Sequence, residues 1–245
     1  MKPTVRHWTA FLPWITAFAI SMAFLESAVV IYLRDLYYPG GFTFPLAPIR
    51  PHIAITELLR EVATMMMLLA PGALISTARI DRFAWFCFCF GVWDIFYYVF
   101  LKAVLDWPAT IFEPDILFLV PVVWVGPVLA PCVVSIGLIM LAGILLHRRS
   151  IQPHFRLKGV HWSALVLSGS LILYTFLEEP VGYVLKTSGI RSISSWPASD
   201  AEALVALQGY IPEHYDWWTF IVALIVGGWV LVDLFWHGLR REQAR

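Results

Sequence analysis

Charged residues are scarce in this sequence of 245 residues. They make up 14% of the chain, while hydrophobic residues make up 60%. Soluble domains carry about 25% charged residues. The chain has no long polar segment, which excludes a separate soluble domain. The 17 basic and 17 acidic residues cancel to a net charge of zero, which argues against nucleic acid as a partner. This composition predicts an integral membrane protein that contacts the lipid bilayer.

Cysteine is scarce as well. Cys87, Cys89 and Cys132 lie in apolar runs, and none belongs to a CxxC or CxxCH pattern. We interpret them as small core residues, so that disulfides, c-type haem and a zinc knuckle have no support. The sequence also has no Walker A, GxSxG or dinucleotide-binding motif. Neither a metal nor a cofactor is predicted.

Six apolar stretches are long enough to cross a bilayer, whose hydrocarbon core needs about 20 helical residues. We predict spans at about 8–36, 53–78, 83–104, 116–146, 160–185 and 217–239. The first stretch is too long for the apolar region of a signal peptide, so we expect it to be retained. The predicted fold class is all-α: a polytopic membrane helix bundle of six transmembrane helices that forms one domain.

The fourth span is predicted to be broken by proline. Pro121, Pro127 and Pro131 each remove a backbone donor, which kinks or interrupts a helix. Two interpretations stay open. One is a proline-kinked helix over the whole of 116–146, and the other is a short re-entrant segment over 116–125 followed by the true span.

The basic residues predict the orientation. Inner loops of membrane proteins carry an excess of Lys and Arg. With the N-terminus inside, the inner side receives eleven of the seventeen basic residues: Lys2, Arg6, Arg79, Arg82, Arg148, Arg149, Arg156, Lys158, Arg240, Arg241 and Arg245. Both termini are therefore predicted to be cytoplasmic. In the last outer loop, the spacing of Ser199 and Glu202 predicts a short surface helix over 199–208.

Six carboxylates lie inside the predicted spans: Glu26, Glu57, Glu61, Asp94, Glu178 and Glu179. Four of the helices place a carboxylate at a similar depth in the outer half of the bundle, counted at about 1.5 Å per residue. The basic residues of the outer side that lie within or beside these spans are Arg34, Arg60 and Lys102. Three acids are therefore in excess, and we expect them to be protonated, hydrated or engaged with a cation.

Helical phase indicates where two of these helices point. Glu57 and Glu61 share one face, with Arg60 beside them. Asp94 shares a face with Gly91, Tyr97 and Tyr98, and a glycine lets another helix approach closely. We expect Asp94 to face the interior, because facing lipid costs several kcal/mol.

The candidate site residues form one predicted cluster. In it, Arg60 or Arg34 is expected to touch at least one of the acids Glu26, Glu61 and Asp94. The candidates are Glu26, Arg34, Glu57, Arg60, Glu61, Asp94, Tyr97, Tyr98, Glu178 and Glu179.

Three strings carry a resemblance to a known family. FLESAVVIYLRDLYYP, WDIFYYVFLK and PVVWVGPVLAP resemble an uncharacterised family of bacterial multi-pass inner-membrane proteins. The resemblance covers about residues 20–145. It implies a location in a bacterial inner membrane and brings no activity with it.

Three functions stay open at this point. The acid-rich cluster is predicted to hold a proton, a cation or a small polar ligand. Alternatively, the chain is a non-catalytic subunit that binds another membrane protein or a second copy of itself. In the third interpretation it is an intramembrane enzyme for a lipid or isoprenoid, with the carboxyl groups as general acid and base.

Overall fold

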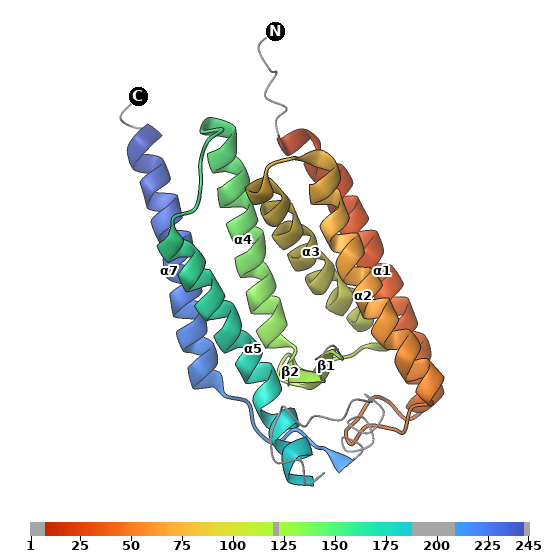
Figure 1. Ribbon diagram of the computed structural model, residues 1–245. Helices are drawn as coiled ribbons and strands as arrows, with labels where there is room; N and C mark the ends of the chain where they lie inside the picture. The colour runs from red at the N-terminus through yellow and green to blue at the C-terminus, as the bar shows by residue number, and fades with distance from the viewer. Residues whose placement is uncertain (1–7, 120–122, 188–208, 243–245) are drawn as a thin grey trace.

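The computed structural model describes residues 8–119, 123–187 and 209–242, with the side chains of the last segment described as far as 236. Within this part of the chain, six helices are long and apolar enough to cross a membrane. They are α1 (Leu12–Tyr37), α2 (Pro51–Ile75), α3 (Arg79–Leu105), α4 (Leu129–Ile151), α5 (Gly159–Thr187) and α7 (Trp217–Glu242), as Figure 1 shows. A 3₁₀ turn, Trp8–Ala10, precedes α1. The predicted all-α bundle of six membrane-spanning helices is confirmed.

Several helix ends follow from local chemistry. Pro51 opens α2, where its fixed φ suits the first helical position and its missing N–H costs nothing. α3 begins four residues earlier than predicted, because Asp81 in its first turn accepts a hydrogen bond from Ser76 Oγ at 2.9 Å and suits the positive helix end. α3 ends at Leu105, and Asp106 follows in the left-handed conformation with φ of 52°.

α3 is the central helix of the bundle. It packs against α1, α2 and α4, while α5 packs mainly against α7 (Figure 1). α3 and α4 approach each other closely at Gly91, where an added Cβ would lie 2.6 Å from the carbonyl oxygen of Ser135. Trp85 and Leu145 are among the buried residues of the core between these helices. α2 and α5 make no extensive contact with each other in the described residues.

The predicted fourth span is wrong in its first part. Residues 114–127 contain two antiparallel strands, β1 (Pro114–Phe118) and β2 (Trp124–Pro127), and α4 begins only at Leu129. Pro127 ends β2, and Pro131 lies in the first turn of α4, where proline is tolerated. Of the two interpretations, the one with a separate segment before the true span is closer to the structure than the one with a kinked helix over 116–146. The separate segment is a β-hairpin.

The two ends of the bundle differ. At the terminal end, α1 begins and α7 ends (Figure 1). At the opposite end, which we call the hairpin end, lie β1, β2 and the connection over 38–50. The predicted surface helix over 199–208 lies outside the described residues.

Candidate functional site

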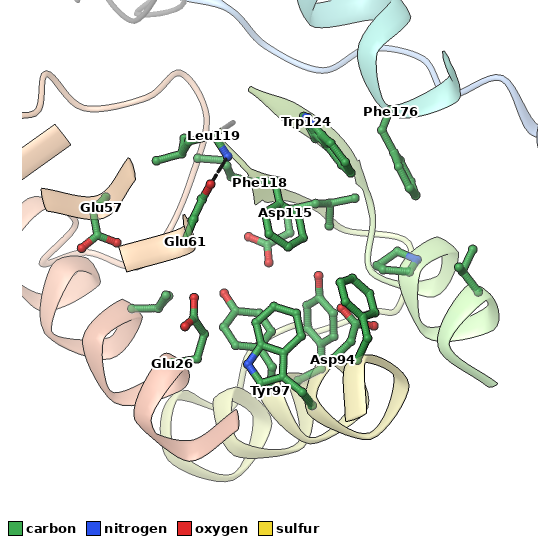
Figure 2. Close-up of a pocket in the computed structure, with 18 of the residues that line it drawn as sticks. Glu26, Glu57, Glu61, Asp94, Tyr97, Asp115, Phe118, Leu119, Trp124 and Phe176 are labelled. Carbon is green, nitrogen blue, oxygen red and sulfur yellow. Dashed lines mark hydrogen bonds between the residues drawn. The ribbon is translucent and has the colours of Figure 1, made fainter. Parts of the chain in front are cut away.

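A cavity of about 500 Å³ runs between the helices (Figure 2). Residues of α1, α2, α3, the hairpin, α4 and α5 line it, from Tyr38 at the hairpin end to Leu165 in the second turn of α5. Its volume falls within the range of about 300–1,000 Å³ that is typical of small-molecule sites. Its apolar lining includes Phe86, Phe90, Phe118, Leu138, Leu165, Ile172, Leu173 and Phe176.

The charged part of the wall lies in the half of the bundle nearer the hairpin end. Its five carboxylates belong to Glu26, Glu57, Glu61, Asp94 and Asp115, which Figure 2 labels. Among the described lining residues, the bases are Arg34 and Arg60 alone. The cavity therefore has three more acidic than basic side chains at one end and an apolar wall at the other.

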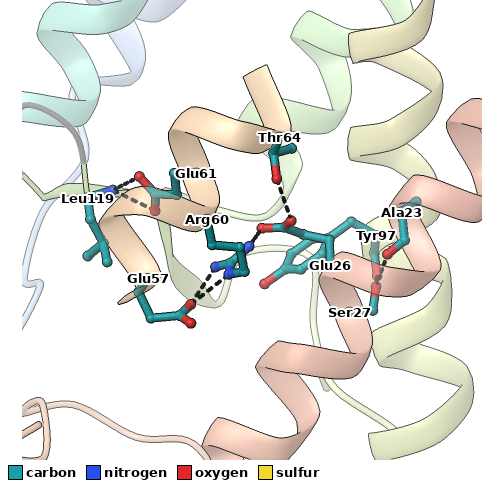
Figure 3. Close-up of polar contacts among 9 residues, drawn as sticks. All are labelled: Ala23, Glu26, Ser27, Glu57, Arg60, Glu61, Thr64, Tyr97 and Leu119. Carbon is teal, nitrogen blue, oxygen red and sulfur yellow. Dashed lines mark hydrogen bonds and ion pairs between the residues drawn. The ribbon is translucent and has the colours of Figure 1, made fainter. Parts of the chain in front are cut away.

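Arg60 of α2 joins the acids of two helices (Figure 3). Its Nη1 pairs with Glu26 of α1, and its Nε donates to Glu57 Oε2 at 2.9 Å. Thr64 Oγ1 donates to the second oxygen of Glu26 at 3.1 Å. The side chains of Glu26 and Glu57 are 10% and 8% exposed, so this ion-pair group is largely shielded from solvent. The contact that we expected between Arg60 and one of the acids is present.

Glu61 connects α2 to the hairpin. Both of its carboxylate oxygens accept a hydrogen bond from the backbone N–H of Leu119, each at 2.9 Å (Figure 3). Leu119 directly follows β1, so this N–H belongs to irregular backbone that needs a partner. The position of the hairpin in the bundle thus depends on a carboxylate that also lines the cavity.

A buried ion pair fixes the other side of the hairpin. Arg34 Nη2 of α1 donates to Asp115 Oδ1 of β1 at 3.1 Å, and the two side chains are 7% and 3% exposed. The guanidinium lies over the rings of Phe42 and Trp107, with its central carbon 4.4 Å and 3.8 Å from their centroids. Aromatic faces attract a cation that has left water. These contacts explain how Arg34 is accommodated in the interior.

Asp94 makes a hydrogen bond across the α3–α4 interface. Ser135 Oγ donates to its Oδ2 at 2.8 Å, and Asp94 faces the interior as predicted, with 8% of its surface exposed. The absence of a side chain at Gly91, one turn before Asp94, brings the backbone of Ser135 close enough for this bond.

Three buried donor atoms at the cavity have no hydrogen-bond partner among the described residues. They are the indole Nε1 atoms of Trp93 and Trp124 and the second terminal nitrogen, Nη1, of Arg34. Trp93 is 5% exposed and Arg34 is 6% exposed. Buried donors without partners are rare in proteins, because each costs about 1–3 kcal/mol. These three donors are therefore an unusual feature of residues that line the cavity.

The structure brings eight of the ten predicted candidates to this cavity, including Tyr97 and Tyr98 of α3. It leaves out the two glutamates of α5. Glu178 is exposed, and Glu179 accepts a hydrogen bond from Tyr210 Oη at 2.8 Å outside the cavity. Burial, together with this hydrogen bond, raises the pKa of Tyr210, so the phenol keeps its proton and remains the donor.

Four residues of the site were missed by sequence reasoning. Asp115 follows a polar connection, where a carboxylate is unremarkable, and its burial depends on the unforeseen hairpin. Ser135, Trp93 and Trp124 lie in apolar runs that carry no catalytic or ligand-binding spacing. For Ser135, the signal was the small residue on the helix that faces Gly91, but the pairing of α3 with α4 had to be known first.

The part of the chain that the structure describes has no group of three or more His, Cys, Asp or Glu residues placed to hold a metal ion. Comparison with protein-family models, with characterised proteins and with solved structures found no match for this chain.

The arrangement suits a molecule with two unlike ends. An apolar body fits between the aromatic and aliphatic side chains of α3, α4 and α5. A head group at the hairpin end would meet carboxylates in excess. A positively charged head would offset the surplus of acids.

Proposed function

We propose that this protein binds a membrane-soluble amphiphile with a cationic head group, and that it does so to carry or sense that molecule within the bilayer. The observation that carries the proposal is the division of one cavity into an apolar part and a part with five carboxylates and two arginines. A cation without its water is costly to bury unless acids surround it. The surplus acids supply that compensation.

The side of the bundle between α2 and α5 offers a route to the cavity. These two helices both contribute lining residues but do not pack extensively on each other in the described chain. A ligand that dissolves in lipid would pass between them without crossing the aqueous loops.

Three long-chain probes with matched tails test the proposal. The purified protein in nanodiscs of phosphatidylcholine is titrated with octadecylamine, octadecanol or octadecanoic acid, and unfolding is followed by intrinsic fluorescence. Octadecylamine should raise the melting temperature, because a ligand at about 100 times its Kd stabilises by about 2.7 kcal/mol. Octadecanoic acid should not, because its carboxylate meets the excess of acids. Equal effects of amine and acid would contradict the proposal.

A pair of Glu→Gln variants localises the effect. Glu61→Gln removes a charge from the cavity wall while its amide oxygen still accepts the hydrogen bond of Leu119. Glu178→Gln makes the same chemical change at an exposed position outside the cavity. Stabilisation by octadecylamine should weaken in the first variant and persist in the second. An unchanged response of Glu61→Gln would place the amine elsewhere.

A second candidate function is favoured by the aromatic rings beside Asp94. Phe90, Trp93, Phe118 and Trp124 form a continuous group, with centroids 5.4 Å, 6.1 Å and 5.2 Å apart for the successive pairs. Aromatic faces stabilise cations, including the carbocation of a protonated alkene. In this function, a carboxylic acid would protonate an isoprenoid double bond, and loss of a proton from the neighbouring carbon to a carboxylate would move that bond.

Deuterium labelling separates this enzyme from a binding protein. An isoprenoid incubated with the protein in D₂O would gain deuterium, as detected by mass spectrometry, and Asp94→Asn would abolish the exchange. No exchange above that of empty nanodiscs would leave the binding function alone.

The location is proposed on separate grounds. The excess of basic residues at the terminal end supports an orientation with both termini in the cytoplasm. The resemblance of three sequence strings to bacterial multi-pass proteins supports a bacterial inner membrane. Fractionation of the native organism on a density gradient tests the compartment.

A further inference from the structure

A second cavity, which shares no lining residue with the acid-rich one, lies at the terminal end. Its volume is about 740 Å³, and it is formed where three segments meet: the start of α3, the end of α4, and the connection into α5. Its lining includes Arg79, Arg149, Arg156, His154, Phe155 and Trp162. None of the described residues that line it is acidic.

The basic side chains of this cavity differ in their surroundings. Arg149 is 18% exposed, and its Nε donates to Asp81 Oδ1 at 2.8 Å, which holds the guanidinium in place. Arg79 and Arg156 are exposed at the rim. Through its salt bridge with Arg149, Asp81 offsets one of the three arginine charges. A net positive charge remains.

The aromatic residues of the cavity are fixed by their neighbours. Phe155 lies under the guanidinium of Arg148, whose central carbon is 5.0 Å from the ring centroid. Trp162 packs on Phe83 with a centroid distance of 5.1 Å, and 39% of it is exposed. Tryptophan prefers the boundary between lipid and water, where its apolar ring and its N–H are both accommodated.

We propose that this cavity binds the phosphate head group of an anionic phospholipid. One guanidinium group can donate two parallel hydrogen bonds to two oxygens of the same phosphate, which a lysine ammonium group does not do. Helix ends mark the membrane surface, and the terminal end is the one predicted to face the anionic inner leaflet. The exposed apolar side chains of α5 beyond Trp162, Val166 and Leu167, provide a surface for the acyl chains. The site is independent of the amphiphile cavity.

Native mass spectrometry tests the site on the whole protein in a neutral detergent. Phosphatidylglycerol and phosphatidylcholine with identical acyl chains are supplied together, and the lipids retained are counted. The variant is Arg79→Gln with Arg156→Gln. The control is Arg50→Gln with Lys186→Gln, which removes two exposed basic residues at the hairpin end. Monodisperse elution and an unchanged melting temperature confirm that each variant is folded.

The wild type and the control should retain phosphatidylglycerol in preference to phosphatidylcholine. Each basic residue near an anionic membrane contributes about fivefold in affinity, so the double variant should bind phosphatidylglycerol roughly 25-fold more weakly. Equal retention of the two lipids by the wild type, or equal losses in variant and control, would overturn the proposal. So would complete displacement of the lipid by excess inorganic phosphate, which would assign the site to the free anion.

Discussion

The close approach of α3 and α4 at Gly91 can be tested by adding a single methyl group. In Gly91→Ala, the new Cβ would lie 2.6 Å from the carbonyl oxygen of Ser135 and 2.8 Å from Cγ1 of Ile139. Real Cβ atoms essentially never approach a heavy atom more closely than 3.0 Å, so the two backbones must separate by at least about 0.4 Å in a close-packed interior. Such overpacking costs about 1–3 kcal/mol.

A second glycine supplies the control for this variant. Gly137 lies in α4, and an added Cβ there would meet nothing within 4 Å. Alanine is a better helix former than glycine by up to about 1 kcal/mol, and both variants receive this gain. The difference between Gly91→Ala and Gly137→Ala therefore isolates the helix contact. It should amount to about 1–3 kcal/mol, which is about 2–12 °C in melting temperature for a chain of this size.

Intrinsic tryptophan fluorescence during heating, in one detergent for all samples, measures this difference. The expected order of melting temperatures is Gly137→Ala at or above the wild type, and Gly91→Ala clearly below both. If Gly91→Ala melted as high as Gly137→Ala, the close packing of α3 on α4 would be refuted, and with it our account of how Ser135 reaches Asp94.

Three further predictions concern charge and orientation. Asp115→Asn should lower the free energy of unfolding by about 3–5 kcal/mol, because it leaves the buried guanidinium of Arg34 without its partner. Asp106→Asn, which breaks an exposed pair with Lys102, should leave the melting temperature unchanged. Equal effects of the two variants would show that burial of the pair does not matter. Asp94→Asn should melt within about 2 °C of the wild type, since an amide oxygen can still accept the hydrogen bond from the Ser135 hydroxyl. A melting temperature lower by more than about 10 °C would reveal an ionic partner of Asp94. Reporter fusions after Arg82 should report the cytoplasm, and fusions near Gly41 the outside; either one on the wrong face breaks the proposed orientation.

The sequence was sufficient for the helices and for most of the acid cluster. The need to hide backbone polar groups from lipid leaves few alternatives to a helix in a long apolar run, so five of the six spans were placed to within a few residues. The prediction for 116–146 failed because an apolar run rich in β-branched residues suits a buried strand as well as a helix. Surrounding helices supply the partners that allow a hairpin there.

The partners within the site were harder to predict than its members. Phase and depth brought Glu26, Glu61 and Asp94 to one cavity, because both follow from counting along a helix. The partner of each acid depends on how neighbouring helices are rotated, which no single helix records. Asp115 was therefore missed, and the glutamates of α5 were included although their helix turns them away from the cavity.

The pairing of Glu26 with Arg60 bears on how the chain is inserted during synthesis. These residues belong to α1 and α2, which are consecutive along the chain and leave the ribosome before α3. A single charged residue at the centre of a helix costs about 2.5–3.5 kcal/mol on insertion. A pair of helices that meet at an ion pair would enter the bilayer with these charges already matched. α1 and α2 otherwise touch little, and both pack more extensively on α3. The ion pair and the hydrogen bond from Thr64 to Glu26 would therefore join the first two helices before α3 is made.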